Sequence, residues 1–243
     1  MYEVIENISY DMRLFGIKAA AERRCQEALA SGMHPSELVR LLLEDERDAR
    51  RQAVAKRLAS GAKFRNQCSL SDWDMTTDRG ISKAKLKELA LVNFFHKKQN
   101  LLIEGTTGVG KTHLAIALGK VICDDGNSTR FFSTNLFFEE VAAEKAAGRY
   151  LQFIRKIAKM AAIILDDFAL RNYTHDEATI LLEVLEERYG KGIVIVTSQV
   201  SPSGWKTLFE DPVIAEAIID RLKNPSESIK LTGPTRRARV KGN

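Results

Sequence analysis

Several residue types are scarce in this chain of 243 residues, and each scarcity excludes a class of protein. Its 3 cysteines lie far apart, which excludes a disulfide scaffold and the close ligand spacing of a zinc site. The 5 prolines and 15 glycines are too few for a collagen-like or low-complexity chain. No apolar run approaches the roughly 18 residues of a membrane-spanning helix. The N-terminus carries Glu3, Glu6 and Asp11 where a secretory signal has basic residues. We therefore expect a reduced, cytoplasmic, globular protein with no membrane segment.

Basic residues are concentrated in three stretches, although the net charge is only +5. Residues 47–65 contain seven basic side chains and one acidic one, residues 79–98 six and one, and residues 229–243 five and none. A local positive potential of this kind favours a polyanionic partner such as nucleic acid. The alternative is a solvated helix face with ordinary ion pairs between helical neighbours. The candidate DNA-binding residues come from the first stretch: Arg47, Arg50, Arg51, Lys56 and Arg57.

The sequence pattern divides the chain into a helical region and an α/β region. Up to about residue 66, apolar residues recur at helix spacing and no strand pattern is present. Residues 66–82 are polar and lack periodicity, which is typical of a linker. We therefore expect a helical N-terminal region over 1–66, a linker and first helix over 67–98, and the main domain over 99–243.

Short apolar runs alternate with amphipathic stretches from residue 99 onward. The pattern predicts strands at 101–103, 130–133, 163–165 and 193–196, and helices at 112–122, 136–147, 150–159 and 175–189. Thr174 and Glu177 are placed to form a capping box at the start of the last of these helices. Strands that alternate with helices require crossover connections, so we predict a doubly wound parallel sheet with helices on both faces.

A phosphate-binding motif stands between the first predicted strand and its helix. Residues 105–112 read GTTGVGKT, a complete match to G-x-x-x-x-G-K-[ST]. The glycines allow the loop N–H groups to point at phosphate oxygens, and the following helix adds the positive end of its dipole. In this motif Lys111 contacts the β- and γ-phosphates and the Thr112 hydroxyl ligates Mg²⁺. The predicted nucleotide contacts are Gly105, Thr106, Thr107, Gly108, Val109, Gly110, Lys111, Thr112 and His113.

A second acidic element follows at residues 161–167, which read AAIILDD. We predict that Asp166, at the end of this strand, holds Mg²⁺ and that Asp167 polarises the attacking water. There is room for a helix, a strand and a helix between Lys111 and Asp166. The additional strand separates the loop strand from the acidic strand, as in additional-strand ATPases. ATP and Mg²⁺ are the expected ligands.

These motifs resemble those of a known group of AAA+ ATPases. GTTGVGKTHLAIALG (105–119), IILDDF (163–168), IVTSQV (195–200) and DPVIAEAIIDRL (211–222) are similar to the IstB and DnaC group, which comprises transposition helper proteins of insertion sequences and bacterial helicase loaders. The resemblance extends from about Leu38 to the C-terminus. It is closer to IstB, because TSQ is followed by Trp205 and later by an Ile-Lys-Leu-Thr-Gly strand.

The resemblance implies further site residues. The first sensor, a polar residue that ends the fourth strand, is Thr197 or Ser198, and Ser198 is taken as the candidate catalytic residue. Arg221 occupies the place of the arginine finger, which acts on a neighbouring subunit's nucleotide. Arg236 or Arg237 is a candidate second sensor. The wider superfamily usually has Glu where this chain has Asp167, so we expect slow turnover, which suits a switch.

The resemblance leaves two functions open. The first is an ATP-dependent regulator that forms a homo-oligomer on duplex DNA and recruits or activates a transposase. The second is a helicase loader that docks on a hexameric helicase and contacts single-stranded DNA. Single-strand binding usually employs aromatic stacking platforms. Aromatic residues make up only 7% of the chain, and the phenylalanines at 131, 132, 137 and 138 fit core packing, which favours duplex binding.

Overall fold

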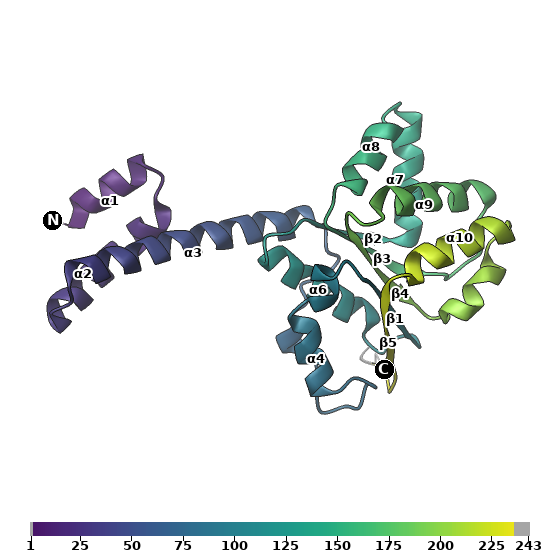
Figure 1. The fold of residues 1–243 in the computed structure, drawn as a ribbon, viewed down its shortest axis with the longest axis horizontal. Coiled ribbons are helices and arrows are strands. Elements are labelled where there is room, and N and C mark those ends of the chain that lie inside the picture. Colours follow the sequence, from purple (N-terminus) through teal and green to yellow (C-terminus); the bar gives the residue numbers. More distant parts are fainter. Residues whose placement is uncertain (1, 236–243) are drawn as a thin grey trace, which may run out of the picture. The chain divides into compact units, whose positions relative to one another are not determined.

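A computed structural model describes residues 2–235, and the chain divides into two compact units between Arg57 and Leu58 (Figure 1). We call Met1–Arg57 the N-terminal unit and Leu58–Asn243 the α/β unit. The division falls earlier than the boundary expected at residue 66. The two candidate second sensors, Arg236 and Arg237, lie outside the described residues.

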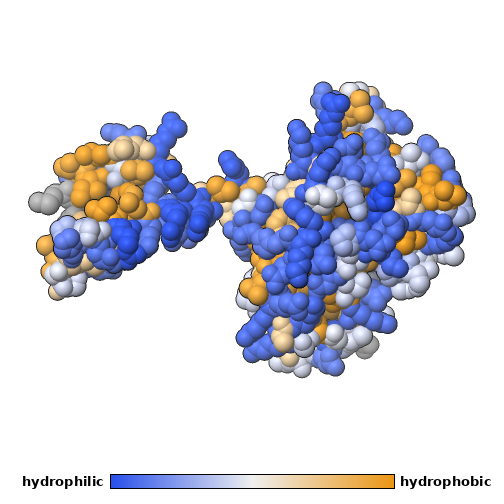
Figure 2. Space-filling model, in the orientation of Figure 1, coloured by the Kyte–Doolittle hydropathy of each residue, from blue (hydrophilic) through white to orange (hydrophobic). Residues whose placement is uncertain are grey.

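The N-terminal unit is built from helices. They are α1 (Tyr2–Asp11), α2 (Phe15–Ser31) and α3 (Pro35–Gly61), the last of which continues into the α/β unit. Figure 2 shows apolar surface on this unit, and its exposed apolar side chains include Val4 and Phe15. The unit therefore combines an apolar surface on α1 and α2 with the basic residues of α3.

One buried carboxylate joins α2 to α3. Helix α2 has no side-chain cap of its own, and the Glu46 Oε2 accepts hydrogen bonds from the N–H groups of Gly16 (2.7 Å) and Ile17 (3.2 Å) in its first turn. A carboxylate at a helix N-terminus also interacts favourably with the helix dipole. A Cβ at Gly16 would lie 2.5 Å from the Asp45 carbonyl oxygen, so only glycine permits this approach of the two helices.

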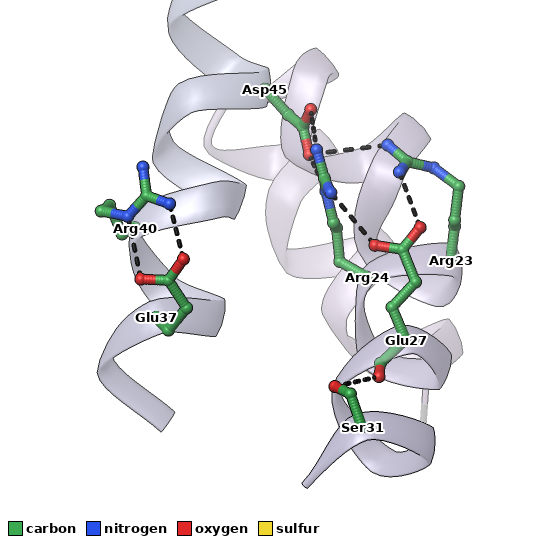
Figure 3. A network of polar contacts seen from close by, with 7 residues as sticks. All are labelled: Arg23, Arg24, Glu27, Ser31, Glu37, Arg40 and Asp45. Carbon is green, nitrogen blue, oxygen red and sulfur yellow. Dashed lines mark hydrogen bonds and ion pairs between the residues drawn. The ribbon is translucent and has the colours of Figure 1, made fainter. Parts of the chain in front are cut away.

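A network of ion pairs joins the same two helices at a second point (Figure 3). The Arg24 Nε lies 2.7 Å from the Asp45 carboxylate, and Glu27 accepts hydrogen bonds from both Arg23 and Arg24. The hydrogen bond from Arg24 lowers the pKa of Asp45. Several basic residues of this unit are thus neutralised by internal partners.

The α/β unit contains a parallel sheet of five strands in the order β2-β3-β4-β1-β5. The strands are β1 (Asn100–Gly105), β2 (Thr129–Ser133), β3 (Ala162–Phe168), β4 (Ile193–Ser198) and β5 (Ser226–Leu231). Along the chain β2 comes between β1 and β3. In the sheet, however, β2 lies at an edge, and β4 is the strand between β1 and β3.

Helices cover both faces of the sheet, as the sequence predicts (Figure 1). On one face lie α4 (Lys83–Ala90), α5 (Asn93–His96) and α6 (Lys111–Asp124). On the other face lie α7 (Thr134–Ala146), α8 (Tyr150–Ala158), α9 (His175–Arg188) and α10 (Pro212–Lys223). Successive residues of a strand point to opposite faces of the sheet, so Ile164 packs in the core on the α6 side and Ile163 in the core on the α9 side. The predicted capping box of α9 is present.

Residues 66–82 pack on the α/β unit, although the sequence predicts a linker. Their only regular element among the described residues is a 3₁₀ turn at Leu70–Asp72. Trp73 is nevertheless only 5% exposed and belongs to the core on the α6 side. Its ring centroid lies 5.9 Å from that of His113. Trp73 is therefore a packing anchor, and the segment forms a wall beside the start of α6.

Candidate nucleotide-binding site

The phosphate-binding motif forms a loop between the end of β1 and the start of α6. Gly105, Gly108 and Gly110 have φ values of 154°, 84° and 110°, which disfavour any residue with a Cβ. Lys111 is buried, and its Nζ donates to the carbonyl oxygens of Gly105 (2.9 Å) and Thr106 (3.0 Å). The first N–H groups of α6 have no partner within the helix, and they give the loop a positive electrostatic potential. Strand, loop and helix thus stand in the order that a phosphate-binding site requires.

A set of oxygen ligands lies next to this loop. The Thr112 hydroxyl donates to both carboxylate oxygens of Asp166, at 2.9 and 3.0 Å. Burial raises the pKa of Asp166, and the adjacent Asp167 raises it further, whereas the hydrogen bond from Thr197 lowers it. A hydroxyl and a carboxylate are hard ligands that Mg²⁺ prefers, and a bound cation would offset the burial of the Asp166 charge. The residues present therefore fit Mg²⁺ bound with the nucleotide phosphates.

Two threonines hold Asp166 in place. The Thr197 hydroxyl, from β4, donates to the Asp166 carboxylate at 2.6 Å and accepts from the backbone N–H of Asp167 at 3.0 Å. The Thr134 hydroxyl, at the start of α7, donates to the Asp166 carbonyl oxygen at 2.8 Å. Because these bonds fix both the backbone and the carboxylate, the orientation of Asp166 is set before any ligand binds.

A β-bulge places the second carboxylate beside the first. The pairing of β3 with β4 shifts register between Leu165 and Phe168. Asp167 lies within this shift and has a φ of 55°, a left-handed conformation that Asp tolerates better than most residues. The bulge interrupts the strand alternation at the edge of the sheet where the loop lies. Asp167 is half-buried and close enough to Asp166 to act on its pKa.

The structure places the Ser198 hydroxyl on the opposite face of the sheet from the Asp166 carboxylate. The Ser198 hydroxyl donates to the Val200 carbonyl oxygen at 2.8 Å and accepts from Trp205 Nε1 at 3.2 Å. Trp205 belongs to the core on the α9 and α10 face, whereas Asp166 bonds Thr112 of α6 on the opposite face. Successive side chains of β4 point to opposite faces, so Thr197 rather than Ser198 meets Asp166. Gln199, the next residue, accepts a hydrogen bond from Thr107 of the loop at 2.7 Å.

Arg221 lies at the opposite end of β1 from the phosphate loop. Its carbonyl oxygen accepts a hydrogen bond at 2.9 Å from the side chain of Asn100, the first residue of β1. A strand of this length spans about 17 Å at the usual rise per residue. The structure therefore does not bring Arg221 together with Lys111 and Asp166 of the same chain.

Arg79 is a site residue that sequence reasoning missed. It is 4% exposed, and its Nη1 donates to the carbonyl oxygens of Val109 (3.3 Å) and Pro234 (3.0 Å). It thereby joins the phosphate loop to the segment that follows β5. Thr235 of this segment lies directly against Gly108, so glycine is needed there for space as well as for conformation. A buried arginine in a non-periodic polar segment has no recognisable sequence signal.

His113, a predicted nucleotide contact, faces the wall formed by residues 66–82. Its Nε2 lies 3.1 Å from the Ser69 carbonyl oxygen, and its ring lies beside Trp73. His113 therefore connects the start of α6 with this wall.

The five candidate DNA-binding residues all lie on α3. At 100° per residue, the four arginines fall within an arc of roughly 120°, and Lys56 lies on the opposite side of the helix. Arg50 is bonded at 2.6 Å to Glu46, the carboxylate that caps α2, and so has a structural partner. Arg51 and Arg57 are exposed.

The described residues contain no group of three or more His, Cys, Asp or Glu side chains that could hold a metal ion. Within the same part of the chain, every helix is too short or too polar to cross a membrane.

Solved structures share the fold of the α/β unit. DnaI aligns with 70% of this chain and 91% of its own, at 24% identity and a TM-score of 0.58. The DnaC helicase loader aligns with 68% of this chain and 96% of its own, at 17% identity and a TM-score of 0.54. DnaA from Aquifex aeolicus with bound AMPPCP gives a TM-score of 0.56 at 15% identity over 70% of this chain and 51% of its own. At these identities the likeness establishes the fold alone.

Sequence comparison extends over nearly the whole chain. An ATP-binding protein in an insertion sequence of Mycobacterium tuberculosis is 33% identical over 236 residues, which cover 97% of this chain and 94% of that protein. An insertion-sequence ATP-binding protein of Sinorhizobium fredii is 32% identical over 226 residues, 93% of this chain and 92% of that protein. Residues 8–243 match the family described as IstB-like ATP binding protein. The chain therefore belongs to the IstB-like ATP-binding proteins, and its α/β unit has the fold of AAA+ P-loop domains.

Proposed function

We propose that this protein is an ATP-dependent regulator that assembles on duplex DNA and recruits or activates the transposase of its insertion sequence. One observation carries the proposal. In each chain Lys111, Thr112 and Asp166 lie together beside the phosphate loop, whereas Arg221, the proposed arginine finger, stands at the far end of β1 from them. Efficient hydrolysis then requires a second subunit, which makes ATP turnover a consequence of assembly. The insertion-sequence relatives support a transposase as the partner.

The site geometry supports a separate role for each of its residues. Lys111 exchanges its bonds to Gly105 and Thr106 for bonds to phosphate oxygens. Thr112 and Asp166 would hold Mg²⁺, which would neutralise charge on the phosphates and on the transition state. Thr197 fixes the positions of the Asp166 carboxylate and of the Asp167 backbone, and Asp167 polarises the attacking water. Its side chain is one methylene shorter than the usual Glu, so we propose a slow turnover that suits a switch.

The exposed arginines of α3 supply the proposed contact with duplex DNA. Contacts of this kind bind phosphates without reading the sequence, so target choice is expected to be loose. The phenylalanines at 131, 132, 137 and 138 are all buried and do not offer a stacking platform for single strands. These observations favour duplex binding over the helicase-loader alternative.

Replacing Arg47, Arg51 and Arg57 together by Ala is expected to weaken duplex binding. If each arginine contacts one phosphate, the slope of log affinity against log salt falls by roughly 3. Fluorescence anisotropy over a series of salt concentrations measures this slope. Arg50 is kept, because its loss would leave the buried Glu46 without its cation.

Lys56→Ala is the matched control for this variant. It removes one charge from the opposite side of the same helix, and the salt slope is expected to change by less than one unit. An unchanged slope in the triple variant would show that Arg47, Arg51 and Arg57 have no part in DNA binding.

The assembly itself is tested by particle size. Light scattering is measured with ATP, with ADP and without nucleotide, each in the presence and absence of duplex DNA. We expect large particles only with ATP and duplex DNA together. Particles of the same size in all six conditions would contradict an ATP-dependent assembly. Co-precipitation with a transposase and with a replicative helicase then separates the two proposed partners.

A further inference from the structure

A buried asparagine holds the end of α10 against the sheet. The Asn100 Nδ2 donates to the carbonyl oxygens of Arg221 (2.9 Å) and Leu222 (3.1 Å), and its Oδ1 accepts from the Val194 N–H at 2.8 Å. Asn100 therefore uses both ends of its amide, and it joins the last turn of α10 to β1 and to β4. Helix C-termini leave carbonyl oxygens without a partner, and a side-chain amide that binds two of them fixes the position of that turn.

An aromatic ring holds the guanidinium of Arg221. Its Cζ lies 5.1 Å from the centre of the Tyr189 ring, at the end of α9. Its Nη1 lies 3.3 Å from the Asp220 carboxylate, and its Nη2 lies 3.9 Å from that of Glu186. The Nε is buried and has no hydrogen-bond partner among the described residues. The backbone and the guanidinium of Arg221 are thus held by different residues.

We propose that Asn100 and Tyr189 are positioning residues that preset Arg221 for the nucleotide of a neighbouring subunit. This inference rests on the proposed function. The Asn100 amide sets where the Arg221 backbone stands, and the Tyr189 ring sets the direction of its side chain. A finger that reaches across an interface is useful only if its geometry exists before the subunits meet, because a displacement of about 1 Å can reduce a rate about 100-fold. The strands that Asn100 joins carry Gly105 and Thr197 at their other ends, so the finger is fixed to the same framework as the site.

Asn100→Ala is the first test. With ATP and duplex DNA, we expect phosphate release to fall between about 10-fold and about 100-fold, with unchanged nucleotide affinity and particle size. The matched control is Asn127→Ala, because that side chain bonds the exposed Asp125 of its own turn and no other described residue, and the activity of this variant should be unchanged.

A mixing experiment separates positioning from a general structural defect. Asp167→Asn subunits should bind nucleotide without hydrolysing it and still present an intact Arg221. When they are mixed with Asn100→Ala subunits, we expect hydrolysis at the Asn100→Ala sites to recover. Mixing Asn100→Ala subunits with Arg221→Ala subunits should give no recovery, because neither of these two proteins supplies a working arginine finger. A chain whose own site is damaged would stay inactive in both mixtures, and this result would overturn the inference for Asn100.

Tyr189 provides a second test that does not depend on a buried residue, because its side chain is exposed. Tyr189→Phe keeps the ring and should keep full activity. Tyr189→Leu should lower phosphate release by about two- to fivefold, the effect of losing an exposed cation–π contact. Equal rates in the two variants would overturn the role of the ring.

The Arg221→Ala variant alone distinguishes this inference from the proposed function. If it hydrolyses ATP as fast as the wild type, the shared active site of the proposed function is wrong. If it loses activity while Asn100→Ala and Tyr189→Leu keep theirs, only the positioning roles are wrong.

Discussion

Replacing Lys111 by Ala is expected to remove most of the nucleotide affinity and, with it, the assembly on duplex DNA. The Lys111 ammonium is buried and bonded to two loop carbonyl oxygens, so it is already placed where a phosphate binds. Removing one member of a buried, hydrogen-bonded charge pair costs about 2 to 5 kcal/mol. The affinity for ATP should therefore fall by at least about 30-fold, a loss that isothermal titration calorimetry measures.

Lys120→Ala is the matched control for this variant. Lys120 lies on the same helix, about 13 Å further along its axis, and should not contact the phosphates. Thermal unfolding of both variants shows whether the loop still folds without the buried cation. If the Lys111→Ala protein folds, binds ATP normally and assembles, the site does not bind nucleotide in the way we describe.

The phosphate loop could be predicted from sequence because its conformation is determined locally. Gly105, Gly108 and Gly110 adopt backbone angles that few other residues reach, so their spacing reports the shape of the loop directly. Asp166 could be predicted from the sequence as well, because it ends an apolar run that has the pattern of a buried strand. The alternation of strands and helices likewise predicted the parallel sheet.

The sequence left Thr197 and Ser198 both open as the first sensor because β4 is buried along its whole length. A strand with one solvated face shows which residues share a side, but a strand buried on both faces gives no such alternation. The bulge at Asp167 adds a second obstacle, because it changes the register without a glycine or proline to mark it. The order of the strands in the sheet could be determined only from the structure, because β2 and β4 have similar sequence patterns and neither shows which of them lies beside β1.

The sequence did not predict the packing of residues 66–82, for a different reason. This segment has little regular structure, so its apolar residues follow no period, and no local pattern marks Trp73 as a core residue. Arg79 is buried by contacts with the loop and with the segment after β5, which are distant in sequence. Contacts of this kind are set by tertiary structure, and a search for local patterns cannot find them.

Replacing Arg221 by Ala is expected to give the largest loss of activity. An arginine finger contributes about 10³ to 10⁵ in rate, which corresponds to about 4 to 7 kcal/mol of transition-state stabilisation. Nucleotide affinity should be unchanged, because Arg221 stands at the other end of β1 from Lys111 and Asp166 of its own chain. Phosphate release at saturating ATP and duplex DNA measures the loss, and nucleotide titration measures the affinity.

Mixing shows whether the arginine acts between subunits. Arg221→Ala and Asp167→Asn proteins should each be nearly inactive alone, since one lacks the finger and the other lacks the carboxylate that polarises water. In a mixed assembly, an Arg221→Ala site beside an Asp167→Asn subunit has both groups, so activity should recover to a fraction set by how often the two meet. If Arg221 acted within its own chain, no mixture would restore hydrolysis. Recovery would therefore establish that two chains form each active site, and that a single chain binds ATP but hydrolyses it only once assembled.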